Sequence, residues 1–283
     1  MAKTVLITGS STGFGRLMVT EFLAAGWDVI ASLRDAEGRK ELYAAELAQH
    51  GDRLSLISLD VADAAQRQAV ADTLRAKGAG LDALINNAGY GLFGALEDLG
   101  EAQLRHQLEV NFFGAVLLTR DLLPLLRERR GVVVNVSSVL GYFGFPLASA
   151  YCASKSALGG FSEALHHELA PHGVRVLLVE PGGHRTSFGH NLVWAEGTSE
   201  VYAVQSKNYL RLRQKLAAGR GTRPEPLARK VVRLVDRPRR KLRLRVGLGA
   251  VCADLFKRLA PERLRLIVLG VLFRRLFLAR TAS

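Results

Sequence analysis

The sequence predicts an α/β fold with a doubly wound parallel sheet of seven strands, followed by a basic, partly apolar helical extension. Short apolar runs alternate with longer segments of helical period along most of the chain, as in parallel sheets covered by helices on both faces. The first apolar run ends in a glycine-rich turn that leads into a helix. The composition, 48% hydrophobic and 23% charged over 283 residues, is that of a folded globular chain.

Each predicted strand is a short apolar run, and each predicted helix repeats its apolar residues every three or four positions. The strands are expected at residues 4–8, 27–33, 53–59, 81–85, 131–136, 174–180 and 241–246. The helices are expected directly after the glycine turn and at residues 38–50, 63–78, 101–129, 149–170, 201–218 and 226–236. Pro124 is expected to kink the longest helix or to lie near its end. Residues 187–200 have no clear period and hold several apolar side chains, which favours a lid.

The other predicted elements are arranged around residues 4–15. Gly9, Gly13 and Gly15 follow the first strand, and apolar residues at helical spacing begin at Leu17. The turn therefore leaves free backbone N–H groups at a helix N-terminus, where a pyrophosphate can bind because no Cβ keeps the backbone away. A tight turn that holds no ligand is the alternative for this segment alone.

The end of the second strand indicates which dinucleotide would bind. Leu33 occupies the position where an acidic residue would accept a hydrogen bond from the ribose 2′-hydroxyl of NAD, and Arg34 follows it. Because a guanidinium can bind a 2′-phosphate with two nitrogens, the pattern favours NADP(H). Asp35 is the counterargument, since it could pair with Arg34 or be the acid itself. A surface arginine without a ligand also stays open.

Polar and small residues follow the third and fourth strands, at the sheet edge where parallel sheets bind ligands. Asp60 is expected to accept a hydrogen bond from an adenine amino group, or else to cap the next helix. The run NNAG at 86–89 lets the backbone approach a flat ligand, although it equally suits a turn. Asn111 interrupts an apolar helical pattern, where a buried amide must be paired.

The net charge of +13 is concentrated toward the C-terminus. Residues 205–283 hold 22 Lys and Arg against 4 Asp and Glu, whereas residues 1–204 hold 17 against 22. A basic extension on a slightly acidic body differs from a nucleic-acid-binding domain, in which the fold itself carries the positive face. Anionic lipid, an acidic partner and a solvated basic surface stay open as explanations.

Residues 1–247 are expected to form the dinucleotide-binding and catalytic domain, and residues 248–283 a helical extension. The apolar run 266–273 lies between Arg265 and Arg274, and it is far shorter than the roughly 20 residues that span a bilayer. A basic helix with a broad apolar face is expected to pack on a subunit or the core, to lie in a membrane interface, or to cap the substrate cleft.

The start of the chain and its cysteines indicate a reducing, cytoplasmic location. Met1-Ala-Lys leads straight into the first strand without the pattern of a secretory signal. The two cysteines, Cys152 and Cys252, cannot form a disulfide framework or a four-ligand zinc site. No metal site is expected elsewhere, because the adjacent His166 and His167 cannot share a helix face.

The order and spacing of these motifs resemble the short-chain dehydrogenase/reductase family over residues 4 to about 246. The match comprises TGSSTGFG at 8–15, Asp60-Val61, NNAG at 86–89, Asn111, SS at 137–138, YCASK at 151–155 and PGGHRT at 181–186. The run VIASLRD and the length beyond the last strand are most similar to the hydroxysteroid and retinol dehydrogenase branch, which acts on apolar ketones and alcohols. The resemblance implies a Rossmann fold that binds NADP(H) through Gly9, Ser11, Thr12, Gly13, Phe14, Gly15, Arg34, Asp60, Val61, Asn87, Ala88, Gly89, Tyr151, Lys155, Pro181, Gly182 and Thr186.

The candidate catalytic residues are Ser138, Tyr151, Lys155 and Asn111. Hydride transfer from nicotinamide to a carbonyl carbon builds negative charge on oxygen, which a proton donor must neutralise. Tyr151 is the expected donor, because a phenol of pKa about 10 becomes more acidic beside a cation, and Lys155 lies one helical turn away. Lys155 can also hydrogen-bond the nicotinamide ribose, and Ser138 would hold the substrate oxygen. By resemblance, Asn111 fixes a water that relays protons from Lys155 to solvent.

The sequence therefore predicts an NADP(H)-dependent oxidoreductase that acts on a hydrophobic ketone, aldehyde or alcohol. Two other functions stay open: an NADP(H)-binding regulator without catalysis, and a β-ketoacyl reductase acting on an acidic carrier protein, which the basic tail suggests. By resemblance, a homodimer or homotetramer would pair through the helices around 103–129 and 149–170.

Overall fold

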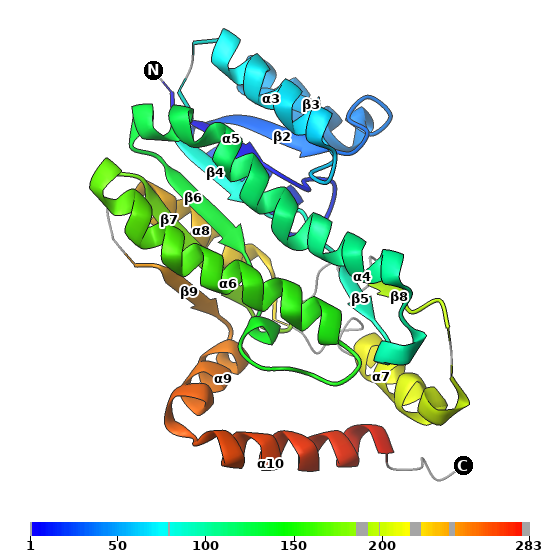
Figure 1. The fold of residues 1–283 in the computed structure, drawn as a ribbon. Helices are drawn as coiled ribbons and strands as arrows, with labels where there is room; N and C mark the ends of the chain where they lie inside the picture. Colours follow the sequence, from blue (N-terminus) through cyan, green and yellow to red (C-terminus); the bar gives the residue numbers. More distant parts are fainter. Residues whose placement is uncertain are drawn as a thin grey trace.

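Seven parallel strands form the central sheet, in the order β3-β2-β1-β4-β6-β7-β9 (Figure 1). The computed structural model describes residues 2–78, 80–184, 192–197, 199–215, 222–237 and 241–278. The strands are β1 (Thr4–Ile7), β2 (Asp28–Leu33), β3 (Leu54–Ser58), β4 (Ala83–Asn86), β6 (Val132–Val136), β7 (Arg175–Pro181) and β9 (Arg243–Val246). All neighbouring pairs are parallel. The predicted doubly wound sheet is confirmed, and the strand order reverses between β1 and β4, where such sheets bind ligands.

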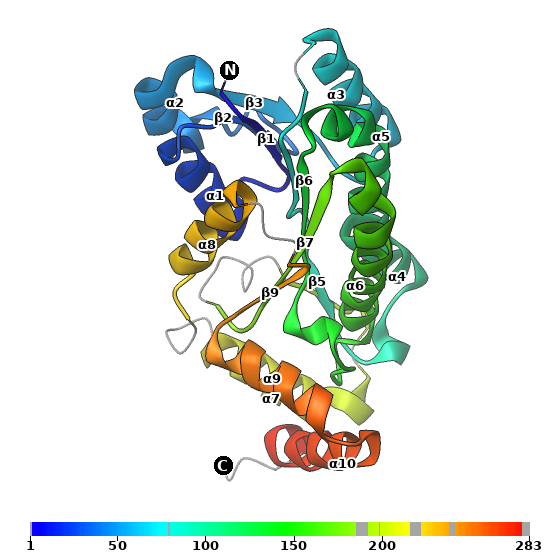
Figure 2. The same cartoon turned by 90° about the vertical axis from the view of Figure 1, so that its left-hand side faces the viewer.

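Helices cover both faces of the sheet, as Figure 2 shows. One face carries α1 (Gly13–Ala24), α2 (Ala44–His50) and α8 (Glu225–Asp236), and the other carries α3 (Ala64–Ala76), α5 (Gly114–Arg129) and α6 (Ser149–Leu169). Helix α4 (Glu101–Leu108) precedes α5, and α7 (Ala203–Lys215), α9 (Leu248–Leu259) and α10 (Glu262–Phe273) lie below the sheet in Figure 1. The helical C-terminal extension that the sequence predicts is therefore present.

Both faces of the sheet are buried, which explains the apolar strands. Along β1, Val5 and Ile7 pack into the cluster beneath α1 and α8, while Leu6 packs into the cluster beneath α3, α5 and α6. All three side chains are fully buried. Successive side chains of a strand point to opposite faces, so a strand covered on both sides needs apolar residues at every position.

The structure differs from the sequence prediction in two places. Part of the segment 187–200 is a strand, because β8 (Leu192–Trp194) pairs in parallel with β5 (Gly91–Phe93) as a small second sheet. Residues 187–191 and 198 lie outside the described residues, so the expected lid stays a prediction. The long helix predicted over 101–129 is helical throughout and continues past Pro124, but a π-helical turn interrupts it at Glu109–Phe113. Strands of three residues are too short to give a periodic signal, and π turns commonly occur at functional sites.

An ion pair fixes α9 to the sheet, next to a buried carboxylate that is satisfied by its own partners. The Glu180 carboxylate at the end of β7 accepts hydrogen bonds from Arg243 (2.5 Å) and Tyr142 (2.5 Å). Arg245 of β9 pairs with Asp254 of α9 at 2.9 Å. Burial raises the pKa of Glu180, and its arginine partners favour the charged form. The basic residues near 243–245 therefore have a structural use that their pattern in the sequence does not indicate.

A buried chain of amide and hydroxyl groups joins the sheet to α5 and α6. Asn86 Nδ2 donates to Asn135 Oδ1 at 2.8 Å and to Thr119 Oγ1 at 2.9 Å. Asn135 Nδ2 donates to Ser162 Oγ at 2.8 Å. Both asparagines lie at the carboxyl ends of neighbouring strands, Asn135 fully buried and Asn86 nearly so. This network positions α6 against β6 from within the core.

Asn135→Ala is expected to lower the free energy of unfolding by about 2–4 kcal/mol, because Asn86 and Ser162 each lose a buried partner. Urea unfolding followed by circular dichroism measures the change. Gln68→Ala is the control, since Gln68 bonds only Asp72 on the exposed side of α3. Equal stabilities of the two variants would contradict a stabilising role for the network.

Candidate active site

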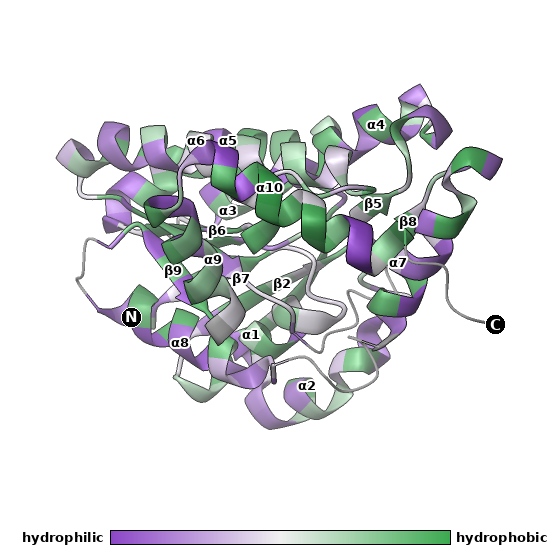
Figure 3. Cartoon of the chain, turned by 90° about the horizontal axis from the view of Figure 1, so that it is seen from below, coloured by the Kyte–Doolittle hydropathy of each residue, from purple (hydrophilic) through white to green (hydrophobic). Residues whose placement is uncertain are grey.

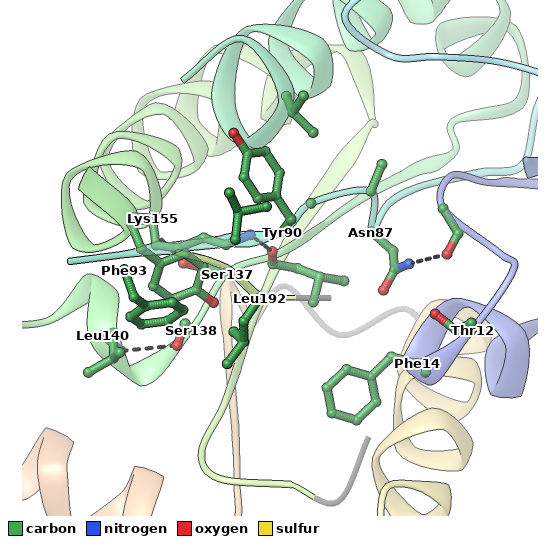
Figure 4. Close-up of a pocket in the computed structure, with 18 of the residues that line it drawn as sticks. Thr12, Phe14, Asn87, Tyr90, Phe93, Ser137, Ser138, Leu140, Lys155 and Leu192 are labelled. Carbon is green, nitrogen blue, oxygen red and sulfur yellow. Dashed lines mark hydrogen bonds between the residues drawn. The ribbon is translucent and has the colours of Figure 1, made fainter. Parts of the chain in front are cut away.

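A cavity of about 920 Å³ runs along the carboxyl ends of the parallel strands. Its lining begins at the glycine turn after β1 and at Arg34 after β2, and it extends to Tyr151 and Lys155 of α6. Figure 4 shows Thr12, Phe14 and Asn87 at one end and Ser138, Phe93 and Lys155 at the other. The cavity is thus long enough to join the predicted dinucleotide site to the predicted catalytic residues.

Most of the predicted site residues line this one cavity. They are Gly9, Ser11, Thr12, Gly13, Phe14, Arg34, Asp60, Val61, Asn87, Ala88, Gly89, Ser138, Tyr151, Lys155, Pro181 and Gly182. Gly15 and Asn111 lie behind its wall, and Thr186 lies outside the described residues. Strand ends far apart in the sequence are therefore brought together as the parallel sheet requires.

The glycine turn is built for close backbone approach. Gly9 and Gly13 have positive φ angles of +64° and +59°, which favour glycine. A Cβ at Gly9 would lie 2.8 Å from Ala88 Cα, and one at Gly15 would lie 2.3 Å from Gly9 O. The first turn of α1 holds no acidic residue, so its N–H groups suit a bound anion. These features fit a dinucleotide pyrophosphate.

Side chains from β1 and β4 hold the turn in place. Asn87 Nδ2 donates to the carbonyl oxygens of Thr8 (2.9 Å) and Gly9 (3.0 Å). Thr8 Oγ1 accepts from the backbone N–H groups of Asn87 and Ala88. Tyr43 Oη donates to Ser10 O at 2.6 Å, and the guanidinium carbon of Arg16 lies 4.3 Å from the centre of the Tyr43 ring. The turn is thereby fixed before any ligand arrives, which lowers the entropic cost of binding.

Two arginines line the end of the cavity next to β2. Arg34 is one, and Arg39 is a second that the sequence interpretation missed, because it lies in an irregular segment without a motif. The Asp35 carboxylate accepts a hydrogen bond from Gly38 N at 2.9 Å and closes the turn. The Asp35 carboxylate therefore bonds the backbone, and Asp35 does not line the cavity. This weakens the alternative in which Asp35 binds the ribose, and it favours Arg34 as a phosphate-binding residue.

Asp60 lines the cavity and does not cap α3. The N-cap of α3 is Asp63, whose carboxylate accepts from Gln66 N at 3.0 Å. Asp60 Oδ1 accepts from Ala62 N at 2.9 Å within the same turn. The helix-cap alternative for Asp60 is therefore wrong, and the residue lies in the cavity lining.

Tyr151 and Lys155 lie on one face of α6, each 5% exposed. Lys155 Nζ donates to Val136 O at 2.9 Å and lies 5.9 Å from the centre of the Tyr151 ring. Ser138 follows β6, and its Oγ accepts from Leu140 N at 3.1 Å, which leaves the hydroxyl proton for another acceptor. The i, i+4 spacing thus places a phenol beside a buried ammonium.

Burial lowers the pKa of Lys155 to about 8. Desolvation penalises the charged amine, and the carbonyl of Val136 compensates in part. A lysine with a shifted pKa in a cavity is typical of a functional group. Cys152, adjacent to Tyr151, is buried in an apolar cluster and desolvation raises the pKa of its thiol, which is typical of a packing residue rather than a nucleophile.

Asn111 holds the cavity wall from behind. Its Oδ1 accepts from Tyr90 N at 3.0 Å, and its Nδ2 donates to Tyr90 O at 2.9 Å and to Ser154 Oγ at 3.1 Å. The amide is 1% exposed. The buried amide of Asn111 is therefore paired with the backbone of Tyr90, which lines the cavity, and with Ser154 of α6. The expected water-relay role of Asn111 stays a prediction.

The far end of the cavity is aromatic. Tyr209 of α7 lines it, and its ring lies 5.4 Å from Phe93 and 5.6 Å from Phe277. Phe93 in turn lies 5.7 Å from the Tyr151 ring. Tyr209 and the nearby Leu212 come from a helix without a motif, so no sequence signal indicated them. In the described ranges, no cluster of three potential metal ligands occurs.

The fold and the cavity define an α/β dinucleotide-binding protein of the dehydrogenase type, and sequence comparison identifies its family. The family model for short chain dehydrogenase matches residues 3–196. The chain therefore belongs to the short-chain dehydrogenase/reductase family of oxidoreductases, and the predicted membership is confirmed.

Two curated relatives act on lipid-like molecules according to their names. The chain is 34% identical to 3-ketodihydrosphingosine reductase of Bacteroides thetaiotaomicron, covering 87% of this chain and 88% of the relative. It is 33% identical to human retinol dehydrogenase 8, covering 87% and 82%. The comparison thus extends over nearly the whole length of these proteins.

Comparison with solved structures agrees with this family assignment. A short-chain dehydrogenase from Streptomyces avermitilis is 37% identical with a TM-score of 0.82, covering 97% of this chain and 99% of that one. A 3-ketoacyl-(acyl-carrier-protein) reductase from Brucella melitensis, complexed with NADH, is 27% identical with a TM-score of 0.72, covering 88% and 98%. A structure from Beutenbergia cavernae with bound NADP is 28% identical with a TM-score of 0.72, covering 89% and 98%. Members of this fold therefore bind either nicotinamide dinucleotide.

Lys155→Met is expected to stabilise the fold at neutral pH, because methionine fills a similar volume without a buried charge. The pKa of Lys155 is about 8 in the folded chain against 10.5 for an exposed lysine, so charging it at pH 7 costs on the order of 3 kcal/mol. Between these values the unfolded chain binds more protons, so wild-type stability rises with pH. Urea unfolding should show the advantage of the variant shrinking from pH 7 to pH 10. An advantage that does not change with pH would contradict a buried ammonium.

Proposed function

We propose that the protein is an NADP(H)-dependent oxidoreductase that transfers a hydride between nicotinamide and a hydrophobic ketone, aldehyde or alcohol. The observation that carries the proposal is the meeting of Ser138, Tyr151 and Lys155 at one end of a cavity whose other end is a glycine turn and two arginines. Family membership supports the class of reaction. Reduction is the proposed direction, because cellular NADP is mostly reduced.

The chain's own residues would handle the oxygen and its proton. A bound NADPH would supply the hydride. Ser138 donates its hydroxyl proton in a hydrogen bond to the substrate oxygen, since its Oγ accepts from Leu140 N and leaves that proton for another acceptor. Tyr151 gives its proton to that oxygen as negative charge develops. The Lys155 ammonium stabilises the phenolate that remains. Asn111 holds the Tyr90 segment against α6 through its hydrogen bonds to Tyr90 and Ser154.

Preference for NADP(H) over NAD(H) is proposed from the charge around β2. Arg34 and Arg39 both line the cavity, whereas Asp35 bonds Gly38 N. Two guanidinium groups can hold a 2′-phosphate with several charge-assisted hydrogen bonds. A ribose 2′-hydroxyl would need an acceptor instead. Thr186 is proposed as a further cofactor contact by its place in the PGGHRT motif.

The hydrophobic substrate class is proposed from the cavity's far wall. Phe93, Phe145, Tyr209 and Leu212 line it, and such side chains favour apolar surface over charged groups. The names of the two curated relatives agree with this class. The aromatic wall disfavours a carrier-protein substrate, and the assembled Ser138, Tyr151 and Lys155 disfavour a silent regulator. Pairing of two or four copies through the outer faces of α5 and α6 is also proposed, by family resemblance.

Tyr151→Phe should lose turnover by at least about a hundredfold, because the proton donor is removed, while NADPH affinity stays within about threefold. Turnover is followed by NADPH absorbance with a panel of apolar ketones, and affinity by calorimetry. The phenylalanine ring keeps the contact with Phe93, so folding should not change. Retained turnover would exclude this mechanism, and inertness of the wild type toward every carbonyl would favour the regulator.

Arg34→Ala and Arg39→Ala should each raise the KM for NADPH by about tenfold to a hundredfold and leave the KM for NADH nearly unchanged, because each loses a charge-assisted bond to the 2′-phosphate. Arg105→Ala is the control, since Arg105 pairs with Glu101 on the exposed side of α4 and does not line the cavity. A cofactor preference equal to wild type in both variants would refute the NADP(H) assignment.

A further inference from the structure

Helix α10 carries an apolar stripe that faces away from the protein. Leu264, Ile267, Val268 and Val271 follow the spacing i, i+3, i+4, i+7, which normally marks the buried side of a helix. Their exposed fractions are 48%, 61%, 41% and 39%. Figure 3 shows α10 as a largely hydrophobic helix on the surface. We call these four residues, with the neighbouring Leu272, the α10 stripe.

The stripe is exposed although α10 is fixed to the body. The π-helical turn Arg274–Leu278 continues α10 and buries Phe277 completely. Phe277 stacks on Tyr209 and contacts Phe145 at 5.9 Å, and Asn208 Nδ2 donates to Phe277 O at 3.0 Å. The helix is therefore docked by its C-terminal end, and its exposed stripe is held toward solvent.

The charges at both ends of the stripe are positive. Arg263 precedes it, Arg274 and Arg275 follow it, and Glu262 is the acidic residue of this segment. Two copies that packed stripe to stripe would bring these guanidinium groups into the same interface, where like charges repel. An anionic surface would instead be attracted to both ends while the apolar middle is buried.

We propose that the α10 stripe docks on an anionic lipid membrane, with its aliphatic side chains at the boundary of headgroups and acyl chains and its flanking arginines among the headgroups. No helix in the described part of the chain is long and apolar enough to cross a bilayer, so the contact is made by a helix lying in the interface. Each stripe side chain that leaves water strengthens the contact in proportion to its buried area.

The position of α10 gives membrane contact a role in substrate binding, and this step rests on the proposed function. Tyr209 both lines the cavity and stacks on Phe277, so one aromatic layer separates the substrate wall from the docked end of α10. Membrane contact through α10 would bring this wall close to the bilayer. The substrate class is thereby narrowed to a ketone or aldehyde that partitions into lipid.

Co-flotation of the full-length protein with phosphatidylcholine vesicles, with and without about one-third phosphatidylglycerol, tests the docking. Binding to the anionic vesicles should weaken on raising salt from about 0.1 M to about 1 M, because screening shortens the reach of the arginines. The double variant Leu264→Asn/Ile267→Asn, which changes two exposed residues of one helix face, should reduce the partition coefficient by roughly tenfold per side chain. The control Leu42→Asn/Leu96→Asn changes leucines that are 47% and 67% exposed outside α10 and should bind as wild type does.

Three outcomes would overturn the proposal: no binding of the wild type to anionic vesicles, binding of the Leu264/Ile267 variant equal to that of the wild type, or an equal weakening by the control variant. Light scattering without lipid tests whether a second copy of the chain covers the stripe instead, since a mass that falls in the Leu264/Ile267 variant would assign the stripe to self-association. Turnover of a water-soluble aldehyde should be unchanged in that variant, while turnover of a vesicle-borne ketone falls. Flotation needs no turnover, so failure of the proposed activity would be seen separately from failure of the docking.

Discussion

The buried ammonium of Lys155 is the constraint on which the candidate site depends. A charge that is 5% exposed is tolerated only where fixed dipoles meet it, and the carbonyl of Val136 does so at 2.9 Å. The bond requires α6 to lie directly against the end of β6. The buried hydrogen bond from Asn135 to Ser162 also joins β6 to α6. The core packing and the chemistry of the cavity are therefore parts of one arrangement.

The parallel sheet explains why residues spread over most of the chain meet in one cavity. Every strand delivers its carboxyl end to the same edge, so the glycine turn, Asp60, Asn87 and Ser138 become neighbours. Asn87 has two roles at this edge. Its side-chain amide holds the glycine turn, and the residue itself lines the cavity. A preformed turn of this kind binds a dinucleotide without first having to order itself.

The C-terminal extension adds a layer that the central sheet does not supply. Ion pairs through Arg245 and Asp254 fix α9 to β9, and Phe277 packs beneath the aromatic wall at Tyr209. The extension therefore shapes the substrate end of the cavity and exposes the stripe of α10. Basic residues in this region serve two purposes, since Arg243 near the sheet edge satisfies the buried Glu180 while Arg263, Arg274 and Arg275 around α10 are exposed to solvent.

The sequence by itself determined the sheet, the family and a set of site residues of which most line the cavity, because buried strands, glycine turns and the Tyr151–Lys155 spacing are local patterns. It did not determine the small sheet of β5 and β8 or the π turn at Asn111, since three-residue strands and a one-residue helical insertion leave no period to detect. Arg39, Tyr209 and Phe277 lie in segments without a motif. Their place at the cavity was decided only by tertiary packing, which brings together side chains that no spacing along the chain relates.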